Sequence, residues 1–322
     1  MQSPSKVPGN GTVFSRLISA AMERRFPMRL ANEQDCCGLT IGCLREVERG
    51  GTAVIMLCVD LTEQVLAEAV ALHADHIITY SPMPPQPLRR VSVHDPTGRT
   101  VLKCAAEHIA VHSINTACAN APRGLADWLA TALSDGTSSP ILPHSEICEA
   151  GEGRLLECSR ALPLSVIIAR LKDLLGVKHL RLALGVSVDD DNLAKAMECC
   201  FVKTIALQVR SPPESFRPCR RHPANKMSLP LCVIAQCFSQ VGEGARVLRD
   251  CLANVFITSE MSHVDVLEAN ARGVVVLLTG QSTMERAYLR HLREELHEEF
   301  SDSDWQVKVK CSEVDCNPLS IV

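Results

Sequence analysis

The chain has 322 residues, of which 46% are hydrophobic, 22% are charged and 3% are aromatic, and its formal net charge is −4 with a pI near 6.3. This length allows two domains, each with its own core. The slight negative charge and the scarcity of aromatic rings argue against a general binder of nucleic-acid backbones or a platform for stacking bases. No apolar run approaches the roughly 18–20 residues that a membrane span needs, so we expect no membrane segment.

The sixteen cysteines favour a reducing compartment. Most of them lie inside apolar runs, where a thiol behaves as a small hydrophobic side chain, and no C-x-x-C spacing occurs. Residues 1–12 carry no apolar core of a secretory signal. We therefore expect reduced core thiols and a cytoplasmic protein, with mitochondrial and nuclear locations as alternatives. A zinc or iron–sulfur site is the alternative use of the cysteines.

The region before residue 28 has apolar residues at helical spacing and several arginines. The favoured interpretation is a first amphipathic helix of the domain, and a mitochondrial transit peptide is the alternative.

The first half alternates between strand-like and helix-like segments. The run TAVIMLCVDL, residues 52–61, is long and apolar enough for an interior parallel strand, and Thr62 is a candidate N-cap for the helix after it. Further predicted strands cover 76–80 and 109–114, and further predicted helices cover 100–108 and 123–134. This order predicts a layered α/β domain.

The second half repeats the alternation. Helices are predicted over 164–176, 189–201, 262–273 and 283–300, and strands over 179–186, 202–209, 254–260 and 274–280. An edge strand is predicted over 305–315. The proline- and arginine-rich segment 211–230 interrupts the pattern and is predicted to be an exposed loop, with a basic contact patch as the alternative.

We therefore predict an α/β fold of two related lobes, with mixed or parallel sheets flanked by helices. The predicted ranges are an N-terminal helix or leader at 1–27, a first lobe at 28–150, and a second lobe at 151–322 that contains the 211–230 insertion.

Two segments of the second half carry candidate chemistry. Gly242 and Gly244 precede a helical segment, whose first N–H groups could hold an anion. Thr258 and Ser259 follow an apolar strand and are further candidate ligand-binding residues. The Glu260–His263 pair has the E-x-x-H spacing that places both side chains on one helical face, so these two are the candidate catalytic residues. Capping by a serine with a merely polar surface histidine is the alternative.

Histidines elsewhere are predicted to be structural. His73 and His76 lie at a helix-to-strand junction, where residues three apart do not converge. His108 and His112 are predicted to lie in different elements, which makes them a poor pair of metal ligands.

The order of motifs along residues 28–322, apart from 211–230, resembles the Nif-three-like family, also described as GTP cyclohydrolase 1 type 2 homologues. The motifs that carry the resemblance are LANEQDCCGLTIG, VDLTEQVL, ADHIITYSPMPP, VHSINTACANAPRGLADWLA, GEGRLLE, LKDLLGVKHLRLALG, VKTIAL, GEG, ITSEMSHVD and GQSTMERAYL. The resemblance implies an α/β protein of two related lobes that assembles as a homo-oligomeric ring, usually a hexamer, around two-metal sites.

Four positions depart from the ligand pattern that the resemblance implies. Ser81, Asn115 and Gln281 stand where relatives have histidine, and Ala119 stands where they have aspartate. Glu285 is the one carboxylate of the usual set that remains. Since transition metals need several imidazole, carboxylate or thiolate donors, we expect no cofactor, although zinc, manganese or iron at a weaker site is the alternative.

These substitutions predict a family member that acts without catalysis, as a regulator or as a protein that binds partners or a small ligand. The first alternative is a metal-dependent hydrolase of nucleotides or related heterocycles. The second alternative is a nucleic-acid-associated regulator that uses the basic 211–230 segment. The assignment as an enzyme stays open at this point, and homo-oligomerisation with possible protein partners is expected.

Overall fold

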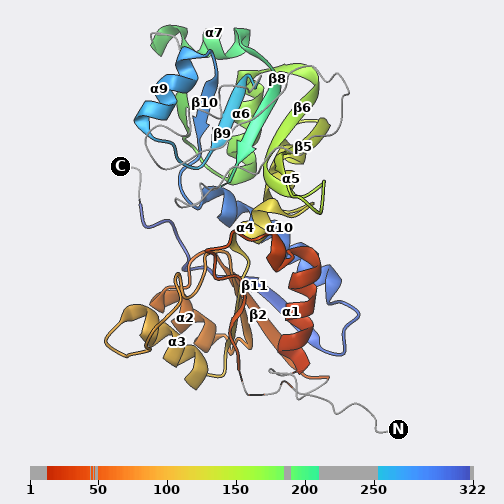
Figure 1. Cartoon of the computed structure of the whole chain (residues 1–322), viewed down its shortest axis with the longest axis vertical. Helices are drawn as coiled ribbons and strands as arrows, with labels where there is room; N and C mark the ends of the chain where they lie inside the picture. Colours follow the sequence, from red (N-terminus) through yellow and green to blue (C-terminus); the bar gives the residue numbers. More distant parts are fainter. Residues whose placement is uncertain are drawn as a thin grey trace. The chain divides into compact units, whose positions relative to one another are not determined.

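The chain folds as a mixed α/β protein with two sheets, each flanked by helices (Figure 1). The computed structural model describes residues 13–43, 45, 47, 50–184, 190–209 and 253–319. The chain divides into two compact units, the first formed by residues 1–115 and 289–316 and the second by residues 116–288 and 317–322.

The C-terminal segment belongs to the first unit because strand β11 (Gln306–Cys311) pairs in parallel with β2 (Thr52–Cys58). The predicted lobes 28–150 and 151–322 instead place this segment in the second lobe. An edge strand shows its alternation in the sequence, but it does not show which sheet it joins.

The first unit is built on a five-stranded sheet with the order β1-β4-β3-β2-β11. Its remaining strands are β1 (Gly38–Ile41), β3 (His76–Thr79) and β4 (Ala110–Ser113). β1 runs antiparallel to β4, and every other neighbouring pair is parallel. The carboxyl ends of β2, β3 and β4 therefore meet at one edge of the sheet.

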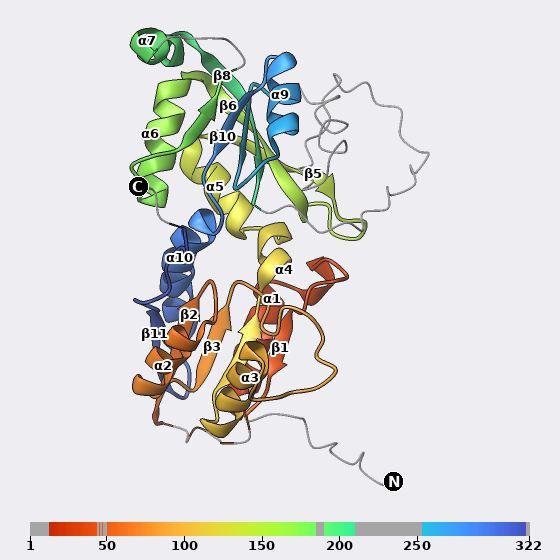
Figure 2. The same cartoon turned by 90° about the vertical axis from the view of Figure 1, so that its left-hand side faces the viewer.

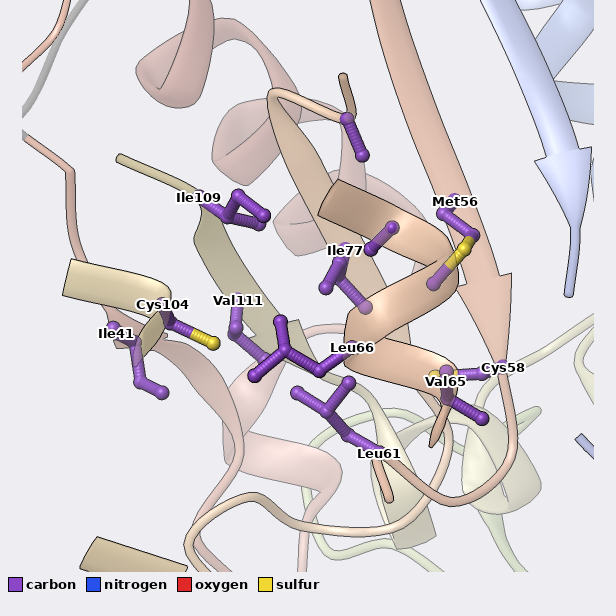
Figure 3. Packing of buried hydrophobic residues seen from close by; sticks show 12 residues of the cluster. Ile41, Met56, Cys58, Leu61, Val65, Leu66, Ile77, Cys104, Ile109 and Val111 are labelled. Atoms are coloured by element: carbon purple, nitrogen blue, oxygen red, sulfur yellow. The ribbon is translucent and has the colours of Figure 1, made fainter. Parts of the chain in front are cut away.

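Helices α2 (Glu63–Ala71) and α3 (Pro96–Ala106) lie over the same face of this sheet (Figure 2). Thr62 caps α2, and its side chain accepts a hydrogen bond from the Val65 amide, as predicted. Figure 3 shows Leu66 of α2 and Cys104 of α3 gathered with Ile77 and Val111 of the sheet in one buried cluster. Burial of this cluster is the main force that holds the two helices on the sheet.

Helix α1 (Val13–Arg25) is the predicted first amphipathic helix, and its apolar side is buried. Helix α10 (Thr283–Glu299) begins in the second unit and ends in the first. Arg25 joins the two helices by ion pairs to Glu295 at 2.6 Å and to Glu299 at 3.1 Å. A short 3₁₀ turn, Met28–Leu30, follows α1.

The second unit contains a six-stranded sheet with the order β5-β6-β8-β9-β10-β7. In chain order its strands are β5 (Gly136–Pro143), β6 (Gly151–Pro163), β7 (Arg181–Ala183), β8 (Phe201–Gln208), β9 (Val255–Thr258) and β10 (Val275–Leu278). β8, β9 and β10 are parallel to one another, and the other neighbouring pairs are antiparallel.

The helices of the second unit are α4 (Asn115–Asn120), α5 (Leu125–Leu133), α6 (Leu164–Leu175), α7 (Asp190–Cys199) and α9 (His263–Ala271), together with the start of α10. Gly176 follows α6 with a φ of 68°, the left-handed conformation predicted for a residue that ends a helix.

The alternation of strands and helices agrees with the sequence prediction except at β1, α4, β5 and β6, which were not predicted. The 211–230 segment lies outside the described residues. No disulfide joins the described cysteines, and Cys58, Cys104 and Cys158 are buried. Among the residues that the structure describes, no helix is both long enough and apolar enough to cross a membrane.

Candidate functional site

The carboxyl edge of the first sheet collects polar residues from successive strands. Asp60 follows β2, Ser81 follows β3 and Asn115 follows β4. The Ser81 amide donates to the Val59 carbonyl at 2.8 Å, and the Asn115 amide donates to the Tyr80 carbonyl at 2.9 Å. Parallel pairing therefore brings these residues to one edge, the usual place for ligands in an open α/β sheet.

Ser81 is held at this edge by a hydrogen bond to a carboxylate. Its Oγ donates to Oδ1 of Asp60 at 2.7 Å, and its carbonyl accepts a bond from the Thr79 hydroxyl at 2.9 Å. The serine side chain is therefore oriented toward Asp60. It offers a neutral hydroxyl at a position where the family resemblance implies a metal-binding imidazole.

A second carboxylate reaches the same edge from the C-terminal segment. Asp315 follows β11, and its Oδ2 accepts a hydrogen bond from the Val59 amide at 2.6 Å. The Ser312 hydroxyl also accepts the Asp315 amide at 3.1 Å, which fixes this turn. The sequence prediction missed Asp60 and Asp315, because the partners lie far apart in the chain and only the sheet order brings them together.

Asn115 begins α4 and is buried, with 3% of its surface exposed and a φ of 28°. Asparagine tolerates the left-handed region better than most residues with a side chain. The residue therefore fits a tight turn at the end of β4.

In the second unit, Ala119 lies in α4 next to a fully buried arginine system. Arg154 is 1% exposed, and its Nε donates to Oδ1 of Asp127 at 2.5 Å. Its Nη2 donates to the carbonyls of Asn120 and Ala121, at 3.4 and 3.2 Å. The guanidinium therefore anchors the backbone directly after Ala119, whose own side chain is a methyl group without a donor atom.

Arg154 also fixes its own strand. Its Nη1 donates to the carbonyls of Gly151 and Gly153, each at 2.8 Å. Gly151 approaches β5 closely, because an added Cβ would lie 2.0 Å from the Leu142 carbonyl oxygen. Arg154 is thus a structural clamp on the GEGR segment and on α4, a role that the sequence analysis did not assign to it.

The carboxyl edge of the second sheet contains the predicted ligand-binding residues Thr258 and Ser259. Both are buried, and Ser259 Oγ donates to the Val209 carbonyl at 3.0 Å. The Gly280 amide donates to the Ser259 carbonyl at 3.0 Å. Gly242 and Gly244, the other predicted ligand-binding residues, lie outside the described residues.

The predicted E-x-x-H helical face does not form. Helix α9 begins at His263 and is capped by Ser262, so Glu260 precedes the helix. Glu260 instead forms an ion pair with Arg181 of β7, and both Glu260 and His263 are exposed. The predicted helical face shared by Glu260 and His263 is therefore wrong, because Ser262 caps the helix and α9 begins only at His263.

Gln281 and Glu285 lie around the start of α10. Gln281 is exposed and precedes the helix, and its carbonyl accepts a hydrogen bond from Asn317 Nδ2 at 3.1 Å. Glu285 lies in the first turn of α10 and is 1% exposed. A carboxylate in the first turn interacts favourably with the helix dipole.

The first sheet also buries two histidines side by side. His76 on β3 and His112 on β4 have ring centroids 6.4 Å apart, and both nitrogens of His76 and Nδ1 of His112 have no hydrogen-bond partner among the described residues. Burial, with repulsion from His112, lowers the pKa of His76 to about 3, and burial lowers the pKa of His112 to about 4. Both are therefore neutral core residues near pH 7.

The donor set at the implied ligand positions does not fit a pair of transition-metal ions. The Ser81 hydroxyl is engaged by Asp60, Ala119 has no donor, and Gln281 offers a neutral amide. Within the described part of the chain, no group of three or more histidine, cysteine, aspartate or glutamate side chains has the geometry to hold a metal ion.

Sequence comparison shows similarity to one family along most of the chain. The profile of the Duf34/NIF3 (NGG1p interacting factor 3) family matches residues 15–198 and 224–318. A NIF3 homolog from Schizosaccharomyces pombe is 27% identical over 95% of this chain and 98% of its own length. A NIF3-like protein 1 from Drosophila melanogaster is 29% identical over 94% and 87%, and the NGG1-interacting factor 3 of Saccharomyces cerevisiae is 26% identical over 92% and 93%.

Structural comparison shows the same fold. A Staphylococcus aureus hypothetical protein superposes with a TM-score of 0.70 at 17% identity, covering 96% of this chain and 99% of that one. A Bacillus cereus protein related to NIF3 gives a TM-score of 0.68 at 17% identity and covers 99% and 100%.

Proposed function

Because this chain belongs to the Duf34/NIF3 family, we propose that it keeps the family fold but acts as a non-catalytic, partner-binding or regulatory protein. The observation that carries the proposal is the hydrogen bond of Ser81 to Asp60, 2.7 Å long. The resemblance implies a metal-binding imidazole at this position. The Ser81 hydroxyl instead donates a hydrogen bond to the Asp60 carboxylate, which thereby has a partner at this strand edge without a cation.

The chemistry of the other substituted positions supports the same proposal. A two-metal hydrolase holds its ions about 3.5–4 Å apart and needs enough anionic and imidazole ligands to bind both. Asn115 and Gln281 supply neutral amides and Ala119 supplies nothing, so Glu285 is the one implied ligand that remains. Divalent transition metals bind weakly to such a set.

Hydrogen bonds stabilise the backbone near the substituted positions. Arg154 anchors the backbone after Ala119, and the Asp60 and Asp315 carboxylates bind donors from their own unit. A protein whose site has lost its ligands but whose framework is intact is suited to present surfaces to partners. The name of the Saccharomyces cerevisiae relative, NGG1-interacting factor 3, describes an interaction with another protein. We extend this partner-binding role, and assembly of the chain with copies of itself, to the present protein as part of the proposal.

Restoring the implied ligands provides the test. Wild-type protein and a variant carrying Ser81→His, Asn115→His, Ala119→Asp and Gln281→His are purified without chelator in the presence of zinc, manganese and iron. Metal content is then measured by mass spectrometry. We expect the variant to gain tightly bound metal relative to the wild type, because it regains three imidazoles and one carboxylate.

The wild-type result separates the proposed function from the hydrolase alternative. Two tightly held ions in each wild-type subunit would overturn the proposal. Hydrolysis of GTP or a phosphoester by the wild type, abolished both by chelator and by Glu285→Ala, would establish the metal-dependent hydrolase instead.

A further inference from the structure

The segment LRRVSVH, residues 88–94, is an exposed stretch between β3 and α3. Leu88, Val91 and Val93 are 37%, 46% and 56% exposed, although apolar side chains usually gain stability from burial. Arg89 and Arg90 are also exposed, and neither forms an ion pair with any residue that the structure describes. All five residues are thus exposed, and the two arginines have no ion-pair partner in the described part of the chain.

Several prolines precede this segment, which forms neither helix nor strand. No helix or strand occurs between Ser81 and Asp95, and Pro82, Pro84, Pro85 and Pro87 precede the two arginines. Proline fixes φ near −65° and favours extended backbone in the residue before it. The segment is therefore an exposed loop outside the helices and strands, and it ends in a turn in which the Asp95 amide donates to the Ser92 carbonyl at 3.3 Å.

The residues of the segment match the substrate pattern of arginine-directed protein kinases. Such kinases bind an extended peptide, pair its arginines with acidic groups and place the apolar residue after the serine in a pocket, a charge pattern that gives them specificity. Here two arginines stand three and two positions before Ser92, and Val93 follows it. Arg-Arg also occurs at 24–25 and 220–221, but a proline occupies the serine position in both.

We propose that Ser92 is a phosphorylation site for an arginine-directed serine/threonine kinase. Ser92 is half-buried through its backbone, which packs against Gly98, where an added Cβ would lie 2.3 Å from the Ser92 carbonyl oxygen. Its Oγ accepts the His94 amide at 3.3 Å, and its hydroxyl proton is donated to no described residue. The nucleophilic oxygen is therefore available while the backbone is held in place.

The reaction is a phosphoryl transfer from ATP. Ser92 Oγ forms a bond to the γ-phosphorus, the bond from that phosphorus to the oxygen bridging the β- and γ-phosphates breaks, and ADP leaves. The hydroxyl proton passes to the aspartate base of the kinase. The product carries a charge of about −1.5 to −2 on Ser92.

The new charge would lie near an arginine that already links two helices. Arg99 of α3 donates from Nη1 to the Val93 carbonyl at 3.0 Å and from Nη2 to Glu63 of α2 at 2.6 Å. A phosphate on Ser92 gives Arg99 a second anionic partner next to its existing contact with Val93. The modification therefore changes the charge of an exposed loop that begins at Ser81, whether or not the chain binds metal.

The full-length protein is incubated with ATP and the catalytic subunit of an arginine-directed kinase, and the product is examined by intact mass and peptide mapping. We expect one phosphoryl group on Ser92, and no modification of this peptide in Ser92→Ala. The double variant Arg89→Gln, Arg90→Gln should be modified about tenfold more slowly or worse, since each lost charge pair weakens recognition. Arg160→Gln, which changes an exposed arginine on β6, serves as the matched control and should retain the wild-type rate.

Three results would overturn the proposal. The first is phosphorylation at other residues with Ser92 unmodified. The second is an unchanged rate in the Arg89/Arg90 variant. The third is modification of a synthetic peptide of residues 86–96 but not of the folded protein, because this would show that the loop is inaccessible.

Discussion

Two hydrogen-bonded polar pairs in this molecule lie at or near positions where the family resemblance implies metal ligands. They differ in how strongly the stability of the fold depends on them. Arg154 and Asp127 form a charged pair in which the arginine is 1% exposed and the aspartate side chain 24% exposed. Ser81 and Asp60 form a neutral-to-charged hydrogen bond, and both residues are partly exposed. A buried charge needs all of its partners, whereas a partly exposed hydroxyl can exchange its partner for water.

This difference explains how a site can change without loss of the fold. The arginine clamp holds α4 and the GEGR segment through several backbone carbonyls, so replacing it disrupts the unit. The Ser81 side chain makes one hydrogen bond, to Asp60 at the end of the neighbouring strand. A substitution at Ser81 is therefore expected to have a small structural cost, whereas the framework of the second unit depends on Arg154.

Removing the clamp is the strongest test of this contrast. Arg154→Met should lower the free energy of unfolding by about 3–5 kcal/mol, because it leaves Asp127 and several carbonyls without their buried partner. Urea denaturation followed by circular dichroism measures the change. Arg160→Met, on the same strand but exposed, is the matched control and should change stability by less than about 0.5 kcal/mol. Equal effects of the two substitutions would show that Arg154 is no clamp.

The two buried histidines predict that the first unit loses folding stability at acidic pH. The pKa values of His76 and His112, about 3 and about 4, lie below the ordinary value of 6.5, so both residues bind fewer protons in the folded state than in the unfolded state. Their contribution to stability is therefore fully present above pH 6.5 and is lost as the pH falls toward 4 and then 3.

The double variant His76→Leu, His112→Leu should show a shallower fall in unfolding free energy between pH 6.5 and pH 4 than the wild type. His94→Leu, which changes an exposed histidine, should keep the wild-type slope. Denaturant titrations across this pH range measure both slopes. If the double variant has the wild-type slope, groups other than these two histidines govern acid unfolding.

The smallest effect is expected at the serine edge. Ser81→Ala removes one hydrogen bond to a partly exposed carboxylate that water can solvate, so we expect a loss of about 1 kcal/mol or less. Thermal or urea denaturation measures it. A loss as large as that of Arg154→Met would contradict the view that the fold does not depend on this position.

The sequence predicted elements whose signals are local. The apolar run from residue 52 became β2, Thr62 capped α2, and Gly176 took the left-handed conformation after α6. In each case a short stretch carries the physical cause, namely burial, a side-chain cap or backbone freedom.

The sequence did not predict features that depend on distant partners. β6 has charged residues, including Glu157 and Arg160, that make it resemble a linker, yet it pairs with β5 and β8 along its length. Arg154 finds its partners in other segments, and Ser81 meets Asp60 only because β2 and β3 are neighbours. The E-x-x-H prediction was wrong because spacing assumes a continuous helix, and Ser262 starts α9 too late for Glu260.

The metal content of the wild-type protein tests the central claim most directly. Protein purified without chelator from a medium supplemented with zinc, manganese and iron is measured for bound metal per subunit. The proposal that the site has lost its ligands predicts far less than one tightly held ion in each subunit. Two tightly held ions in each subunit would contradict it.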